Sequence, residues 1–143
     1  MINVAGLSPH NQLVFAIWCI RQAVMLRGEA NEYMLLACSA ADKFIDGRIS
    51  RNELARTWSL MWGHTQIWSG LWNMLWIILQ SDSHTAAMYA SESVIRFTVH
   101  LKHENCSRDI VSMCKSISDW DEKVRQIYQS QQKRIDELLL CNN

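Results

Sequence analysis

The hydrophobic residues of this 143-residue chain recur every three or four positions between short polar stretches, which is the pattern of amphipathic helices. Ser8 followed by Pro9 is typical of an N-cap and a first helical residue, and the helix that they open is predicted to end at Gly28. A second helix is predicted from Asn31, as its cap, to Gly47, where a left-handed glycine would end it. The apolar positions of these two helices are Leu13, Phe15, Ile17, Trp18, Ile20 and Val24, then Tyr33, Leu35, Leu36, Ala40, Ala41, Phe44 and Ile45.

Capping sequences predict further helices along the chain. Ser50 to Glu53 reads Ser-x-x-Glu, a capping box that begins the third helix. The group Ser81-Asp82-Ser83 caps a fourth helix whose apolar positions run to Leu101, and a short fifth helix is expected around Ile110 to Ile117. Ser118 and Asp119 cap a last, clearly amphipathic helix with Trp120, Val124, Ile127, Tyr128, Ile135, Leu138 and Leu139 close to one face. The sequence therefore predicts an all-α fold of five or six helices in a single domain, residues 1–143.

The third predicted helix leads into residues 57–81, which contain no Asp, Glu, Lys or Arg. Five of the chain's seven tryptophans lie in this window, at positions that span an arc of about 120° on an α-helix. Such a stripe belongs to a core helix, to a membrane helix or to a face that meets a partner. Polar side chains such as Gln66 and Asn73 are costly at bilayer depth, so the sequence argues against a membrane span.

The caps on either side of the tryptophan window predict one helix, or two collinear helices, at the centre of a bundle. We expect three of the tryptophans to lie in the core, namely Trp62, Trp72 and Trp76. The other two, Trp58 and Trp68, lie nearer the edges of the window or of the arc, and these are the residues expected to reach a partner.

Composition narrows the classes of function. The 14 acidic and 14 basic side chains balance, so no basic field favours binding to nucleic acid. The five cysteines are odd in number and form no Cys-x-x-Cys pair, which indicates a reducing compartment, and we expect a cytoplasmic protein. Most of the cysteines fall at apolar positions of the helical pattern, where they are expected to fill the core.

Candidate chemical groups are few. His100, His103 and Cys106 lie three residues apart near the end of the fourth predicted helix and carry side chains that bind zinc. The favoured interpretation is a polar helix end, because histidines are stabilised there by the helix dipole. His64 is the only ionisable side chain of residues 57–81, and we expect a core histidine rather than a catalytic base. No cofactor is predicted.

The run from Ala37 to Ala55 combines an alanine-rich helix, an aromatic residue, an Asp-Gly turn and a capped helix that opens with Glu-Leu-Ala. In this it resembles all-helical, alanine-rich bacterial immunity proteins of toxin systems and related uncharacterised bacterial proteins. The resemblance covers these 19 residues and implies an all-α fold and a protein partner, with no catalytic residue to transfer. In the next helix this chain has tryptophans where those proteins have alanines.

Together these features predict a non-enzymatic protein-binding module, an immunity or inhibitor protein that occludes another protein. The partner is expected to be a different protein, and self-association is the second possibility. A phage-type inhibitor of a bacterial defence system fits the same features. The remaining alternative is a small helical enzyme that binds a metal or ligand through His64 or through His100 and His103.

Overall fold

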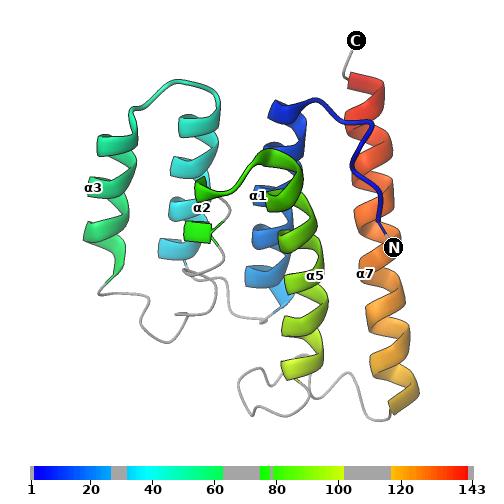
Figure 1. Ribbon diagram of the computed structural model, residues 1–143. Coiled ribbons are helices and arrows are strands. Elements are labelled where there is room, and N and C mark those ends of the chain that lie inside the picture. Colours follow the sequence, from blue (N-terminus) through cyan, green and yellow to red (C-terminus); the bar gives the residue numbers. More distant parts are fainter. Residues whose placement is uncertain (1, 27–31, 63–74, 78, 102–116, 142–143) are drawn as a thin grey trace.

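A computed structural model describes residues 2–26, 32–62, 75–77, 79–101 and 117–141, with the side chains of 26, 62, 97–101 and 117–120 left undescribed. Within these residues the chain is helical and contains no strand, which confirms the predicted all-α fold. The helices are α1 (Pro9–Leu26), α2 (Glu32–Ile45), α3 (Arg51–Trp62), α5 (Ser83–Leu101) and α7 (Ile117–Cys141) (Figure 1). Residues 75–77 and 79–80 are also helical.

Helix α1 begins and helix α2 ends where the sequence predicts, whereas the predicted end of the first helix at Gly28 and the predicted cap Asn31 lie outside the described residues. The Ser8 side-chain oxygen accepts a hydrogen bond from the Asn11 N–H at 3.2 Å and so caps α1. Past the end of α2, Gly47 has φ +75°, and the Arg48 N–H donates to the Lys43 carbonyl at 2.8 Å. Such left-handed closure satisfies carbonyls that the helix end leaves unpaired.

The capping residues of α3 and α5 are also confirmed. The Ser50 side-chain oxygen accepts from the Glu53 N–H at 3.1 Å, as a capping box requires. Asp82 caps α5 by accepting from the Thr85 N–H at 2.9 Å and from the Thr85 hydroxyl at 2.7 Å. The last helix differs, because α7 begins at Ile117 and includes the predicted cap, Ser118 and Asp119, in its first turn.

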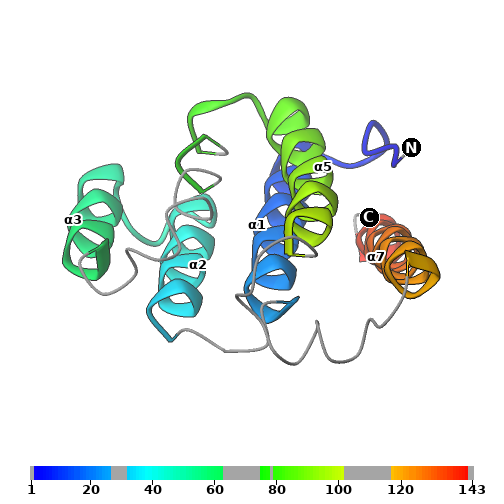
Figure 2. The ribbon, with the colours of Figure 1, turned by 90° about the horizontal axis from the view of Figure 1, so that it is seen from below.

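Helix α1 lies at the centre of the fold, in contact with α2, α5 and α7 (Figure 2). Seven of its side chains are fully buried: Phe15, Ala16, Ile17, Cys19, Ile20, Ala23 and Val24. Opposite them, α5 presents the small residues Ala86, Ala87 and Ala90, each with no exposed surface. Small side chains let two helix backbones approach closely, and α1 and α5 form the most extensive pair among the described helices.

Helix α3 lies at one edge of the row of helices and packs against α2 (Figures 1 and 2). The prediction that the third helix lies at the centre of the bundle is therefore wrong, because α3 packs on α2 at the edge. The expected straight path of the tryptophan window is also wrong. Eighteen residues of straight helix span about 27 Å, whereas the ring centroids of Trp58 and Trp76 are 6.2 Å apart. Residues 75–77 and 79–80 therefore lie back against α3 and do not extend it.

No helix in the described part of the chain combines the length and the apolar character that a membrane crossing requires. The short fifth helix predicted around residues 110–117 falls outside the described residues except for its last position, which belongs to α7.

Candidate functional site

Trp58 is buried between α3 and α2, with 5% of its surface exposed. Its indole N–H donates a hydrogen bond to the carbonyl of Ala37 in α2 at 3.1 Å. Leu54, one turn earlier on the same face of α3, is buried as well. The expectation that Trp58 reaches a partner is therefore corrected, because the face of α3 that carries it is the face that packs on α2.

Trp76 was predicted to lie in the core, and this prediction is wrong, because 53% of its surface is exposed. The neighbouring Leu75 is fully buried. Successive helical residues point about 100° apart, so the burial of Leu75 turns Trp76 outward. The Trp76 ring leans against that of Trp58 at an interplanar angle of 54°, and the adjacent Ile77 is 39% exposed.

The two tryptophans border a hollow of about 30 Å³. Its other lining residues are Arg51, Leu54, Ala55, Leu79 and Gln80. This volume corresponds to roughly one water molecule. The tryptophan pair therefore forms a surface, and a small organic ligand does not fit in it.

The remaining residues singled out in the sequence lie outside the described part of the structure. They are the side chains of Trp62 and His100, and residues His64, Trp68, Trp72, His103 and Cys106. Within the described residues, no group of three His, Cys, Asp or Glu side chains is placed to hold a metal ion.

Two cysteines fill the core as expected, and a third does not. Cys19 and Cys38 have no exposed surface. Burial raises the pKa of Cys38 to about 12 and raises the pKa of Cys19 well above its ordinary value, so neither thiol is a nucleophile at neutral pH. Cys141, at the end of α7, is exposed.

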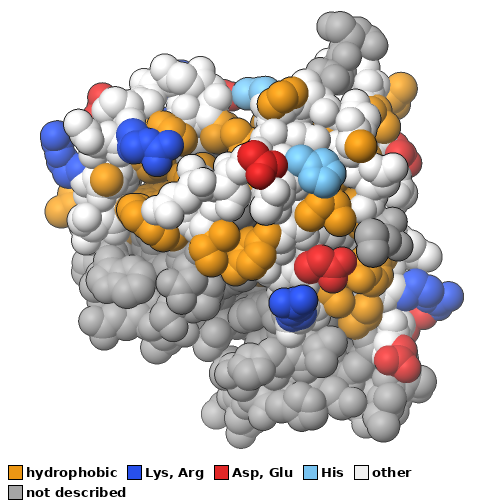
Figure 3. Space-filling model, viewed as in Figure 1, with side chains coloured by type: hydrophobic (Ala, Val, Ile, Leu, Met, Phe, Trp, Pro, Cys, Tyr) orange, Lys and Arg blue, Asp and Glu red, His pale blue; other side chains and the backbone are white. Residues whose placement is uncertain are grey.

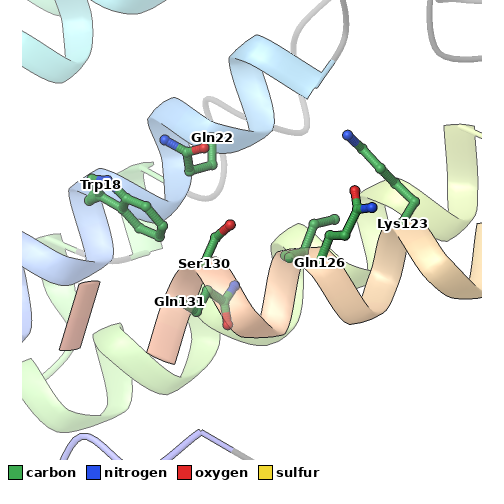
Figure 4. Close-up of a pocket in the computed structure, with 7 residues that line it drawn as sticks. Trp18, Gln22, Lys123, Gln126, Ser130 and Gln131 are labelled. Carbon is green, nitrogen blue, oxygen red and sulfur yellow. The ribbon is translucent and has the colours of Figure 1, made fainter. Parts of the chain in front are cut away.

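A cleft of about 130 Å³ lies between α1 and α7 (Figure 4). Trp18 and Gln22 line it from α1, and Lys123, Gln126, Ile127, Ser130 and Gln131 line it from α7. The side chains of Trp18 and Gln22 project into the cleft from α1, and Ser130 projects toward α1 from α7. The Gln131 amide is hydrogen-bonded to Ser91 of α5. The walls of this cleft are therefore mostly polar around one large aromatic ring.

On the other side of Trp18 a second hollow, of about 260 Å³, lies between α1, α2 and α7. Val14, Trp18 and Ile45 give it an apolar lining, and charged side chains supply the rest: Arg21, Asp42, Asp46, Arg48 and Arg134. We call the cleft and this hollow together the α1–α7 seam, because Trp18 lines both. The seam was not predicted from the sequence, although α7 carries polar and cationic residues three or four positions apart on one face.

The two carboxylates of the seam are paired within it. Asp42 forms an ion pair of 2.5 Å with Arg21. Asp46 lies 3.2 Å from Arg48 and 3.0 Å from His10. The hydrogen bond from His10, and secondarily the charge of Arg48, lower the pKa of Asp46, so this carboxylate is ionised across the physiological range.

Comparisons of the chain with models of known protein families, with curated proteins and with solved structures find no match.

Proposed function

We propose that the chain is a non-enzymatic protein-binding module, an inhibitor or immunity protein that occludes a partner protein through the surface around Trp76. The observation that carries the proposal is the position of the Trp76 side chain, half exposed and resting on the buried ring of Trp58. Tryptophan is the residue most enriched among binding hot spots, and a ring held in one orientation loses little entropy when it binds.

The surroundings of Trp76 support the same proposal. Ile77 adds exposed apolar surface beside it. Hydrophobic side chains reach the surface in the region of residues 75–80, on the face seen in Figure 3. Exposed apolar surface of this kind is characteristic of sites that bind other proteins.

Affinity capture with variant pairs tests the proposal. The unmodified protein and the variants Trp76→Ala and Met25→Ala are immobilised and exposed to lysate of the source cell. Met25 is 63% exposed on α1 and provides a matched loss of exposed apolar surface. We expect the unmodified chain to capture one protein in stoichiometric amount. Trp76→Ala is expected to weaken this binding by about 2 kcal/mol or more, and Met25→Ala is expected to leave it unchanged.

The captured protein is then purified and assayed for its own activity. Loss of that activity on addition of one equivalent of the chain is the expected result for an occluding inhibitor. Equal capture by both variants would show that Trp76 is not the binding residue. A stoichiometric metal in the purified chain, lost from a variant with His100→Ala and His103→Ala, would favour the metal-binding enzyme instead.

A further inference from the structure

The α1–α7 seam has the dimensions of a groove for an extended chain. On α7 its residues run from Lys123 through Ser130 to Arg134, all on one face of the helix. On α1 its residues are Val14, Trp18, Arg21 and Gln22, which lie three or four positions apart along one side of the helix. The distance along α7 from Lys123 to Arg134 is about 16 Å, which an extended peptide spans with about five residues.

Cations lie at both ends of the seam. Lys123 lies at one end and forms no ion pair with any described residue. Arg48 and Arg134 lie at the other end, with 61% and 32% of their side chains exposed. Four cationic side chains line the seam against two lining carboxylates, in a chain whose net charge is zero. A third carboxylate, that of Glu137 on α7, pairs with Arg134 at 3.2 Å.

The two carboxylates of the seam lower its positive charge but leave its cations able to bind a further carboxylate. Asp42 and Asp46 are held by Arg21, by Arg48 and by His10. A guanidinium group has five N–H donors, so Arg48 keeps donors for a further carboxylate after it has paired with Asp46. Between the charged ends, the Trp18 ring offers an apolar contact, and the polar groups of Gln22 and Ser130 border the cleft (Figure 4).

We propose that the α1–α7 seam binds an extended acidic segment of a protein, with a carboxylate at each end and an apolar side chain between them. One carboxylate pairs with Lys123, the other with Arg48 and Arg134, and the apolar side chain lies on Trp18. Because these cations have long side chains, the two acidic residues are four to six positions apart. A nucleic-acid strand fits the seam less well, because its regularly spaced phosphates meet Asp42 and Asp46.

This site is separate from the Trp76 surface, since the two share no lining residue: the seam lies between α1, α2 and α7, whereas Trp76 lies against Trp58 of α3. The proposal therefore stands or fails independently of the proposed function. A Trp76→Ala variant is expected to bind an acidic peptide as the unmodified protein does.

The probe is the hexapeptide acetyl-Glu-Ser-Ala-Leu-Ser-Glu-amide, with a peptide of the same sequence carrying lysine for glutamate as control. Binding is followed by two-dimensional ¹⁵N NMR of the full chain. We expect saturable shifts of the Trp18 indole N–H and of the Gln22 and Gln126 side-chain amides, with the acidic peptide alone. Lys123→Gln and Arg48→Gln are each expected to weaken binding about threefold at low salt.

Lys133→Gln is the matched control, because Lys133 is exposed beside Arg134 and does not line the seam. It is expected to leave binding unchanged, and the spectrum of each variant reports whether the fold is intact. Shifts that are absent at millimolar peptide, that occur equally with the lysine peptide, or that lie away from the seam would overturn the proposal. Tighter binding of an oligouridylate than of the acidic peptide would assign the seam to nucleic acid.

Discussion

Gln131 of α7 and Ser91 of α5 exchange two hydrogen bonds in the interior of the fold. The Ser91 hydroxyl donates to the Gln131 side-chain oxygen at 2.7 Å, and the Gln131 amide donates to the Ser91 carbonyl at 3.3 Å. Each residue is 1% exposed. A shift of α7 by one turn would leave both polar groups buried without partners, so the pair fixes the register of the two helices.

Gln131→Ala is expected to lower the free energy of unfolding by about 1–3 kcal/mol, because it leaves the Ser91 hydroxyl buried without its partner. Gln129→Ala, on the exposed side of α7, is expected to change it by about 0.5 kcal/mol or less. Urea denaturation of the two variants measures the difference. Equal effects of the two substitutions would show that the pair does not stabilise the fold.

Trp58→Phe tests the hydrogen bond between α3 and α2. Phenylalanine keeps most of the apolar contacts but leaves the Ala37 carbonyl without the indole donor. We expect a loss of about 1–3 kcal/mol in the free energy of unfolding, from the missing hydrogen bond and the smaller ring. Trp76→Phe, at the exposed ring, is expected to cost less than Trp58→Phe in the same thermal or urea unfolding experiment. The reverse order would contradict the assigned environments.

Gly47→Ala is expected to lower the free energy of unfolding by about 1–2 kcal/mol, since a Cβ at positive φ is strained. No atom lies within 4 Å of the position that this Cβ would occupy, so the effect is conformational and not a clash. Gly47→Asn is therefore expected to cost less, because asparagine adopts the left-handed conformation more readily. Calorimetric melting of the two variants separates conformational strain from crowding, which would penalise asparagine more.

Thiol labelling at pH 8 is expected to modify Cys141 well before Cys19 or Cys38. The buried thiols have raised pKa values and no access for the reagent, whereas Cys141 is exposed. Peptide mass mapping after brief exposure to iodoacetamide identifies each labelled site. In urea above the unfolding midpoint all three are expected to react at similar rates. Labelling of Cys38 in the folded protein as fast as that of Cys141 would contradict its burial.

Asp82 is expected to make stability depend on pH in the acid range. Hydrogen bonds from the Thr85 backbone N–H and hydroxyl hold the pKa of Asp82 below its ordinary value of 3.8. As the pH falls, the carboxylate of Asp82 is therefore protonated in the unfolded chain before it is protonated in the folded chain. Its contribution to the free energy of unfolding is fully present above pH 3.8 and is lost as the pH falls through the lower pKa of the folded state.

Asp82→Asn is expected to retain the cap while removing this part of the pH dependence, because asparagine also accepts the Thr85 N–H bond and does not titrate. Urea midpoints between pH 2 and pH 6 compare the variant with the unmodified protein. A pH profile of Asp82→Asn that runs parallel to that of the unmodified protein would assign the acid loss to other carboxylates.

Local signals in the sequence are sufficient to predict where α1, α2, α3 and α5 begin or end. A cap such as Ser8, Ser50 or Asp82 acts on a backbone group within four residues of itself, so its effect is visible in a short stretch of sequence. The left-handed turn at Gly47 is local in the same way. The class of fold follows from these signals.

The arrangement of the helices does not follow from the same signals. Helical spacing places Trp58 and Trp76 on one face of a straight helix, about 27 Å apart, but it does not reveal that their rings lie side by side. The central position of α1 depends on alanines of α5 that are distant in sequence. The α1–α7 seam likewise joins Trp18 to residues more than 100 positions later, and periodicity within one helix carries no information about that pairing.

The central position of α1 affects the order in which the molecule can be completed during synthesis. Phe15, Ile17 and Ile20 emerge from the ribosome early, yet α5 and α7, which cover much of α1, begin only at residues 83 and 117. Until those helices emerge, α2 is the only one of the three described helices packed against α1 that has been made. A nascent chain that pauses before α5 therefore exposes this apolar helix to chaperones and to other nascent chains.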